Sequence, residues 1–305
     1  MAVTMRRSWC GYSLRSGRTG DGRKLRQNER DGMLRRAGIE FAEFTAGRRW
    51  SQTAWERIEA LALRGQSIGV GAGVAGSGET VFLEAFFRAN SSQSPLVVFD
   101  VGANQGDYTA EVLGLSARCA QCRVVAFEPS QAACDVLTRR FADCHNVTIV
   151  RSAVSDQEGR VCLHYDEAGS RLSSLYERRL THLGLELGEM VEVETIDLDT
   201  FCAEHAISSI DLLKLDVEGH ELPVLHGAKA LLDRSAVGVI QFEFGGCNID
   251  SRTYVQDFWY ELNPSYDLYR VLRHGLWPIR KYQERLERFV TTNYVAVCRD
   301  GRARW

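Results

Sequence analysis

The sequence predicts an α/β fold: a mainly parallel sheet with helices on both faces. Apolar strand patterns and helix patterns alternate after residue 97, as they do where parallel strands are joined by right-handed crossovers. Residues 97–99 (VVF) lack polar alternation, so this strand should be buried on both faces. The strand leads into the turn Gly102 to Gly106, and open α/β sheets bind ligands at such carboxyl ends.

The elements follow from local patterns taken in chain order. Short apolar runs predict strands, and helical spacing after capping residues such as Ser130 predicts helices. Strands are expected at 97–99, 123–127, 147–150, 159–165, 210–215, 237–244, 266–272 and 289–298, and helices at 109–115, 130–141, 197–205, 222–232 and 254–262. The strand at 159–165 alternates apolar and polar residues, which is typical of a half-exposed strand. No helix pattern separates the last two strands, which favours antiparallel pairing between them.

Composition divides the 305 residues into three parts. Residues 1–36 hold ten Lys and Arg against three acidic residues and no apolar periodicity, which predicts a basic, disordered leader. The alternative is a translation start at Met33. Residues 37–90 are expected to form a helical and irregular lid with a glycine-rich break at 69–78, and residues 91–300 the α/β domain.

The same composition excludes several classes of protein. No apolar stretch reaches the length of a membrane span or resembles a secretory signal, so a cytoplasmic protein without a membrane partner is expected. Acidic residues interrupt the basic leader and no aromatic ladder accompanies it, so no nucleic-acid partner is expected. Nine scattered cysteines are expected to be reduced thiols. Cys119 and Cys122 leave open a redox or zinc pair, although no second pair completes a tetrahedral site.

The turn Gly102 to Gly106 lacks the features of phosphate-binding turns, and this narrows the class of ligand it can bind. It contains neither the third glycine of a dinucleotide fingerprint nor the lysine of a phosphate-binding loop, so phosphate binding is disfavoured. Glu128 ends the next strand, and an acidic residue there accepts hydrogen bonds from the two hydroxyls of a ribose. The sequence therefore predicts a ligand that contains a ribose.

Five sequence blocks in this order resemble the FkbM-type S-adenosylmethionine-dependent methyltransferases. The blocks are FDVGANQGDYT at 99–109, AFEPS at 126–130, SAVSDQEG at 152–159, IDLLKLDVEGHELPVLHGA at 210–228 and QFEFGGCNIDSRTY at 241–254, and the resemblance spans about residues 70–298. It implies a class I methyltransferase (Rossmann-like) fold, with a seven-stranded, mainly parallel sheet and one reversed strand. It also implies S-adenosyl-L-methionine as cofactor and O-methylation of a hydroxyl on a sugar or polyketide-like small molecule or glycan.

The resemblance assigns cofactor contacts position by position. The matching positions are Asp100, Gly102, Asn104 and Gly106 in the cofactor loop, Glu128 for the ribose and Asp156 beside the adenine. The two glycines, Glu128 and Asp156 also have plainer interpretations. The glycines would only make a turn, Glu128 would be a solvated strand end, and Asp156 would only begin the Asp-Gln-Glu-Gly turn.

The chemistry requires a base near the acceptor, because an alcohol is a poor nucleophile until its proton is leaving. The strand at 210–215 delivers the catalytic candidates Asp216, Glu218 and His220 to the carboxyl edge, and Asp216 is predicted to be that base. Capping of the next helix is the alternative for Glu218, and a cap or surface role is favoured for His220. Lys214, within the strand, is expected to form a buried ion pair.

Glu243 and Asn248 are the expected substrate-binding residues, because they follow another core strand at the same edge. A structural carboxylate is the alternative for Glu243. Carboxylates at strand ends would also suit Mg²⁺, but no spacing demands a metal and none is expected. Two other functions stay open: a non-catalytic cofactor-binding scaffold, and a nucleotide-dependent oxidoreductase. The segments expected to select the acceptor are 40–90, 166–190 and 245–285.

Overall fold

The protein is described here from a computed structural model. The structure describes residues 33, 35–69, 74–92, 95–119, 121–167, 169–170 and 172–300. Nearly all of the predicted leader, and residues 70–73 of the predicted glycine-rich break, lie outside them. The chain divides into two compact units, Met1–Leu61 and Ala62–Trp305.

The described part of the first unit is helical. Residues 35–45 form one helix, and α2 (Arg49–Gly65) begins in this unit after a short turn. Two hydrogen bonds fix the turn. The Ser51 hydroxyl donates to the Thr45 carbonyl at 2.7 Å, and the Trp55 indole N–H donates to the Thr45 hydroxyl at 3.1 Å. Within the described residues, no helix is long and apolar enough to cross a membrane.

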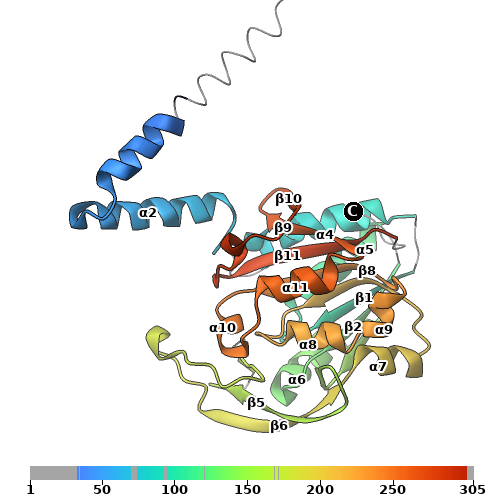
Figure 1. The fold of residues 1–305 in the computed structure, drawn as a ribbon. Coiled ribbons are helices and arrows are strands. Elements are labelled where there is room, and N and C mark those ends of the chain that lie inside the picture. The colour runs from blue at the N-terminus through green and yellow to red at the C-terminus, as the bar shows by residue number, and fades with distance from the viewer. Residues whose placement is uncertain are drawn as a thin grey trace, which may run out of the picture. The chain divides into compact units, whose positions relative to one another are not determined.

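The second unit is built on a mixed sheet of eight strands (Figure 1). Their order across the sheet is β10 (Gly275–Ile279), β9 (Tyr266–Leu272), β11 (Thr292–Cys298), β8 (Val237–Phe244), β7 (Ile210–Leu215), β1 (Leu96–Val101), β2 (Cys122–Phe127) and β3 (Val147–Val150). Strands β3, β2, β1, β7 and β8 are parallel. Strand β11 runs antiparallel to both of its neighbours, which confirms the pairing expected for the last two predicted strands.

The resemblance implied a sheet of seven strands with one reversed strand, whereas the main sheet has eight strands. Strand β10 pairs antiparallel with β9, so the sheet has two reversed strands. The strand was missed because it is a half-exposed edge strand, and Pro278 interrupts its sequence pattern. Proline is tolerated there because the outer side of an edge strand needs no hydrogen-bond donor.

The strand predicted at 159–165 forms, but it belongs to a separate sheet. Strand β5 (Gly159–Tyr165) pairs antiparallel with β6 (Glu189–Ile196), and β6 pairs parallel with the short β4 (Ala153–Val154). Strand β6 was not predicted, although EMVEVETI alternates charged and apolar residues over most of its length.

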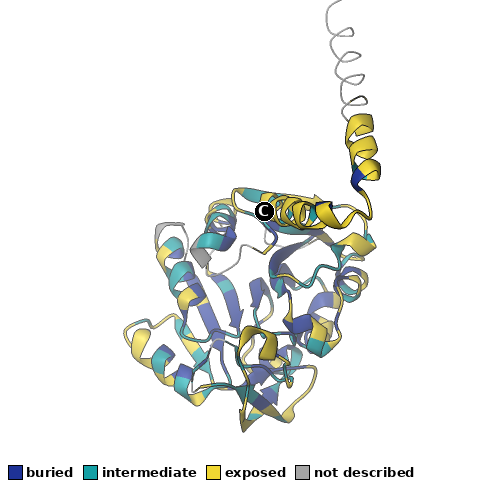
Figure 2. Ribbon diagram, turned by 90° about the vertical axis from the view of Figure 1, so that its left-hand side faces the viewer, coloured by how far each residue is buried: buried dark blue, intermediate teal, exposed yellow. Residues whose placement is uncertain are grey.

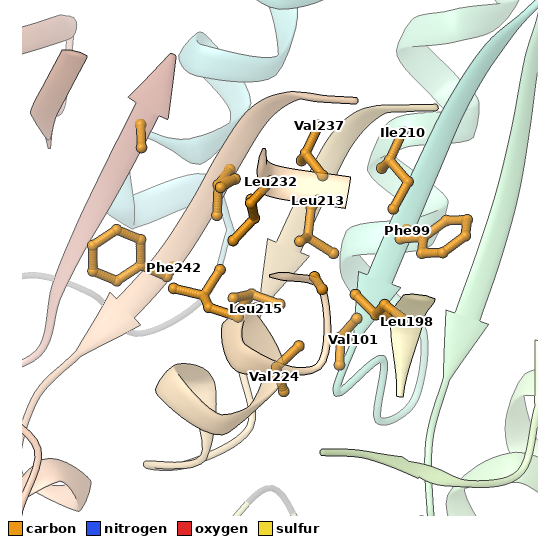
Figure 3. Close-up of a cluster of buried hydrophobic side chains, with 14 of the residues drawn as sticks. Phe99, Val101, Leu198, Ile210, Leu213, Leu215, Val224, Leu232, Val237 and Phe242 are labelled. Carbon is orange, nitrogen blue, oxygen red and sulfur yellow. The ribbon is translucent and has the colours of Figure 1, made fainter. Parts of the chain in front are cut away.

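Helices cover both faces of the main sheet, as predicted. One face carries α4 (Glu79–Ala89), α5 (Asp107–Cys119) and α6 (Gln131–Arg140). The other carries α7 (Leu198–Glu204), α8 (Glu221–His226), α9 (Lys229–Asp233) and α11 (Val255–Leu262). Figure 2 shows the strands between them as buried, and Figure 3 shows the core formed by β1, β7 and β8 against α7, α8 and α9.

The helix expected at 222–232 is broken into α8 and α9 at Gly227. A Cβ at this glycine would lie 2.0 Å from the carbonyl oxygen of Ser155, so the chain passes too close for any side chain. This contact joins the helix break to the loop after β4. The glycine therefore serves packing between two segments that lie 72 positions apart in the sequence.

Helix α4 lies in the segment expected to be a lid, yet it contributes to the core. Phe82, Leu83, Phe86 and Phe87 are fully buried and pack on the sheet with Val98 and its neighbours. The domain boundary expected at residue 90 stays a prediction, but α4 belongs to the fold that forms the sheet edge. Its first residue, Glu79, reaches the functional site described below.

Gly102 gives a stability prediction, because its backbone has φ of +84° and a Cβ would lie 1.9 Å from the Asp216 carbonyl oxygen. Gly102→Ala should lower the free energy of unfolding by about 2–3 kcal/mol. The matched control is Gly114→Ala, in the exposed middle of α5 with open space around it, which should be neutral or stabilise by up to about 1 kcal/mol. Urea unfolding followed by circular dichroism compares the two. Equal stabilities would refute the close approach of the two loops.

Candidate active site

Strand register places two polar rows across one face of the main sheet. In the first row Asp100 of β1 pairs with Lys214 of β7, and Lys214 pairs with Gln241 of β8. Side chains two residues apart on a strand share a face. The second row therefore lies one step nearer the carboxyl edge, with Gly102, Asp216 and Glu243 in it.

The reversed strand β11 completes the second row. Asn293 is the register partner of Glu243, so the edge row runs Gly102, Asp216, Glu243, Asn293 across four adjacent strands. The row lies on the face that α4 and α5 cover. It joins the turn after β1 to a residue from the last strand of the chain.

A buried ion pair anchors the first row, as predicted for Lys214. The Lys214 ammonium lies 3.1 Å from Glu79 Oε1 and 3.5 Å from Asp216 Oδ2, and its side chain is 2% exposed. Burial alone would lower the pKa of Lys214, but Asp216, Glu79 and Glu243 raise it above its ordinary value, so the lysine is charged. The pKa of Glu79 is lowered because Lys214 and three hydrogen bonds outweigh burial.

Tyr108 and Gln241 extend this network. The Tyr108 hydroxyl donates to Gln241 Oε1 at 2.8 Å, and the Gln241 amide donates to Glu79 Oε1. The Lys214 ammonium also lies 5.6 Å from the centre of the Tyr108 ring. The network fixes the position of the ammonium group, and through it the carboxylate of Asp216 at the sheet edge.

A cavity of about 580 Å³ opens at this edge. Its volume is within the range of small-molecule and cofactor sites. Eight of the predicted site residues line it: Asp100, Gly102, Asn104, Glu128, Asp216, Glu218, His220 and Glu243. The register of the strands thus brings together residues that lie more than 140 positions apart in the sequence.

The turn after β1 is held by Glu128. Its two carboxylate oxygens accept hydrogen bonds from the backbone N–H groups of Asn104 at 2.9 Å and Ser130 at 2.8 Å. The side chain is 5% exposed, and burial raises the pKa of Glu128 to about 7. Each carboxylate oxygen has a further lone pair, so the group can also accept from a ligand in the cavity. Glu128 is therefore not a solvated strand end.

The two glycines of the turn are required by internal packing. Gly106 has φ of +83°, and a Cβ there would lie 2.5 Å from the Phe141 ring and 2.7 Å from Leu137. Between them Asn104, with φ of +45°, donates its side-chain N–H to the Ser170 carbonyl at 3.0 Å. The need to form a tight turn therefore explains both glycines. Gly102 and Asn104 also line the cavity.

Asp100 lies beneath the turn and is 1% exposed. The Thr109 hydroxyl donates to its Oδ2 at 2.6 Å, and burial raises the pKa of Asp100 to about 6. This hydrogen bond ties β1 to the first turn of α5. The side chain is placed to brace the turn from within the first polar row.

The carboxylates of the edge row differ in their environments. The Asp216 side chain is 41% exposed and faces the cavity, with Lys214 behind it. Burial, with the neighbouring charge of Asp216, raises the pKa of Glu243 to about 9. At neutral pH Glu243 can therefore donate a hydrogen bond, and Asp216 presents its carboxyl group to the cavity.

Glu218 and His220 face a neighbouring loop as well as the cavity. Arg178 donates to Glu218 Oε2 at 2.6 Å, and the Tyr176 hydroxyl lies 3.0 Å from His220 Nδ1. The other ring nitrogen of His220 lies 2.9 Å from Ser155 Oγ. Burial lowers the pKa of His220 to about 4, so the imidazole is neutral at pH 7. Both of its ring nitrogens already have hydrogen-bond partners in the protein. This geometry does not support a catalytic role for either residue, which stays a prediction.

The helix-capping alternative for Glu218 does not hold either. The backbone N–H groups of Val217 and Gly219 donate to Glu221 Oε1 at 3.1 and 3.2 Å, so Glu221 organises this loop. Glu218 itself has φ of +51° and turns toward Arg178. The loop from Val217 to Glu221 thus holds Arg178 through the carboxylate of Glu218.

Three of the predicted site residues do not line the cavity: Gly106, whose conformation serves the turn, and Asp156 and Asn248. Asp156 is exposed on the turn before β5, where its carboxylate accepts from the Ser155 hydroxyl at 3.0 Å. Asn248 is fully buried, and it accepts from the Gly245 N–H at 2.8 Å and donates to Thr253 Oγ1 at 2.7 Å. Its amide is committed to the short helix α10 (Cys247–Ser251). The positions of Asp156 and Asn248 correct the expectation that both residues face a ligand.

The metal alternatives find no support in the described part of the chain. There, no three His, Cys, Asp or Glu residues are arranged to hold a metal ion. The Cys122 thiol is buried, and burial raises its pKa to about 12, so a reactive thiolate is disfavoured at this half of the CAQC motif.

Five residues of the site were not predicted from the sequence. They are Glu79, Tyr108, Arg178, Gln241 and Asn293. Gln241 had a usable signal, because it precedes Glu243 by two residues on a strand already predicted. Glu79 and Arg178 lie in segments without strong periodicity, and only the folded chain brings them to the site.

This fold and edge cavity define a Rossmann-like α/β protein of the class I methyltransferase type. The family model described as the methyltransferase FkbM domain matches residues 100–266, which is more than half of the chain. The chain belongs to this FkbM methyltransferase domain family. The matched residues include Asp100, Gly102, Glu128 and Asp216, whereas Asn293 lies beyond them.

Two curated relatives share part of the chain. The 2-O-methyltransferase NoeI of Sinorhizobium fredii (strain NBRC 101917 / NGR234) is 27% identical over 148 residues, covering 46% of this chain and 60% of the relative. Methyltransferase sdnD of Sordaria araneosa is 31% identical over 165 residues, covering 46% of this chain and 62% of the relative. The chain thus spans about 60% of the length of these relatives.

The solved structure of methyltransferase FkbM from Methylobacillus flagellatus KT matches with a TM-score of 0.38 and 17% identity, covering 81% of this chain and 60% of that one.

Proposed function

We propose that the protein is an S-adenosyl-L-methionine-dependent O-methyltransferase whose acceptor is a hydroxyl group of a small molecule or glycan. The observation that carries the proposal is the edge cavity that joins the turn after β1, the buried Glu128 and the exposed carboxylate of Asp216, within a chain of the FkbM family. The names of the two relatives, a 2-O-methyltransferase and a methyltransferase, support the reaction type.

The residues present fit the cofactor. Glu128 lines the cavity beside a turn that brings bare backbone of Gly102 to its wall, and its oxygens have lone pairs free for two ribose hydroxyls. The missing phosphate-binding glycines and lysine agree with a ligand that lacks phosphates. When bound, S-adenosylmethionine supplies a methyl group on a sulfonium sulfur, which is released as a thioether when the methyl passes to the acceptor oxygen.

The protein's own part is to orient the acceptor and to take its proton. Asp216 stands next to Gly102 in the edge row, so the base lies one strand away from the turn that holds the cofactor. The buried Lys214 fixes Asp216 from behind at 3.5 Å. The acceptor O–H donates to Asp216 and loses its proton to this carboxylate as the new O–C bond forms.

Methyl transfer is tested directly with radiolabelled S-adenosylmethionine. The purified chain is incubated with fractionated extract of the host and with a panel of hydroxylated compounds, and labelled products are identified by mass spectrometry. We expect the label on an ether oxygen of a product. Binding of the cofactor without transfer to any fraction would favour the scaffold alternative and contradict the proposed activity.

Glu128 gives a prediction for cofactor binding. Glu128→Ala removes the acceptor of two ribose hydroxyls and should weaken S-adenosylhomocysteine binding by at least about 100-fold in isothermal titration, since hydrogen bonds to a charged group contribute about 1.5–3 kcal/mol each. Glu128→Gln keeps one accepting oxygen and should lose less. The exposed Asp233→Asn on α9 is the control and should bind as the wild type does. Unchanged affinity in Glu128→Ala would exclude Glu128 from the ribose site.

A further inference from the structure

The far end of the edge row contains a buried polar atom that the protein itself leaves without a partner. Asn293 lines the cavity and is 6% exposed, and its Oδ1 accepts no hydrogen bond from any described residue. A buried amide oxygen without a partner is unfavourable by about 1–3 kcal/mol. Because Asn293 is one of the residues that line the cavity, a hydroxyl of a bound ligand is a donor that can pair with this oxygen.

Asn293 is placed beside the reacting end of the site and away from the cofactor turn. It is the register partner of Glu243, and Glu243 adjoins Asp216, so three side chains follow one another on adjacent strands. Adjacent strands lie about 5 Å apart, a separation that suits side chains binding neighbouring hydroxyls of one molecule. The turn with Gly102 occupies the opposite end of the row.

We infer that Asn293 and Glu243 together bind a second hydroxyl of the acceptor, next to the hydroxyl that Asp216 deprotonates, so that the acceptor is an uncharged compound with two neighbouring hydroxyl groups. The inference rests on the proposed function and narrows its substrate class. Asn293 Oδ1 accepts from the second hydroxyl, and the protonated carboxyl of Glu243 donates to that hydroxyl's oxygen. The two contacts use both hydrogen-bonding capacities of one alcohol.

The charges around the cavity select against an anionic acceptor. Asp216, Glu79 and Glu128 are among the acidic residues of the wall, and Lys214 is the only lysine or arginine among the described lining residues. The Lys214 ammonium is already paired with Glu79, and the Lys214 side chain is 2% exposed. A carboxylate or phosphate on the acceptor would therefore meet like charge without a free cation.

The test measures kcat and KM on methyl glycosides that have a free 2,3-diol, their 2-deoxy and 3-deoxy analogues and the corresponding uronic acids. We expect wild-type kcat/KM to be at least about tenfold higher for the neutral diol than for its best deoxy analogue, because that analogue leaves Asn293 unpaired. Asn293→Ala should lower kcat/KM for the diol to the level of that analogue and so abolish the discrimination. Asn293→Thr keeps an accepting oxygen and should retain part of the preference for the diol over its deoxy analogue.

The control is Thr292→Val, on the same strand with its side chain on the other face, where its hydroxyl donates to the Val290 carbonyl at 2.8 Å. It should retain the discrimination, and thermal melting verifies that each variant is folded. Discrimination that persists in Asn293→Ala, preference for the uronic acids, or methyl transfer only to compounds without a neutral diol would each overturn the inference while leaving methyl transfer in place. Failure of the wild type to bind S-adenosylhomocysteine would overturn the proposed function itself.

Discussion

Asp216→Asn is expected to lower kcat by roughly 10²–10⁴-fold and to leave the affinity for S-adenosylhomocysteine unchanged. The amide has the same shape as the carboxylate but cannot take the proton of the acceptor, and a positioned general base contributes a factor of this size. Asp216 is suited to the role because its side chain is 41% exposed in the cavity wall and the Lys214 ammonium holds it at 3.5 Å. Steady-state kinetics with labelled methyl donor measure the turnover, and isothermal titration measures the binding.

The neighbouring carboxyl provides the matched control for this variant. Glu243 lines the same wall one strand away, but burial raises its pKa to about 9, so it is already uncharged at neutral pH. Glu243→Gln should therefore keep kcat within about tenfold, because one neutral donor replaces another. If Glu243→Gln loses turnover and Asp216→Asn does not, the base has been assigned to the wrong strand.

Lys214→Met is expected to lower the free energy of unfolding by about 3–5 kcal/mol, because it leaves the buried carboxylate of Glu79 without its counter-ion. Glu79 is buried, and Lys214 is the cation 3.1 Å from it. A methionine of similar length fills the space but carries no charge. Chemical unfolding in urea gives the change in stability.

A second variant separates charge from packing. Glu79→Gln combined with Lys214→Met removes both charges, and the amide introduced on α4 can still form a hydrogen bond with Gln241. The double variant should therefore recover at least half of the lost stability. The surface pair Lys229 and Asp233 is the comparison, since an exposed pair contributes little and Lys229→Met should be nearly neutral. A double variant less stable than Lys214→Met would show that shape, and not the unpaired charge, governs this site.

Most of the fold was predictable because the central strands are buried on both faces and leave a continuous apolar pattern. Val97, Val98 and Phe99 are of this kind, and so is the run at 210–215. The failures occur where burial is partial or where a distant segment interrupts a local pattern. Strand β10 is a half-exposed edge, β6 faces solvent with its charged residues, and the helix at 222–232 is broken by a contact with Ser155 that no local pattern reports.

The site was predictable where it depends on alternation along one strand. Asp216 follows Lys214 by two residues, and Glu243 follows Gln241 in the same way, so each carboxyl shares a face with the row beneath it. Contacts made by irregular or distant segments were not predictable. Arg178 and Asn293 reach the site through a loop and a reversed strand, and Glu218 and His220 have partners that their own motif does not reveal.

The central claim is that the carboxyl edge between β1 and β8 holds the cofactor with its ribose on Glu128 and its sulfur directed toward Asp216. A crystal structure of the full chain with S-adenosylhomocysteine tests it most directly. The expected result is an adenosine whose two ribose hydroxyls lie within hydrogen-bond distance of the Glu128 carboxylate, with open space remaining between the sulfur and the row Asp216, Glu243, Asn293. Density for the ligand elsewhere, or a Glu128 side chain that makes no contact with it, would contradict the claim.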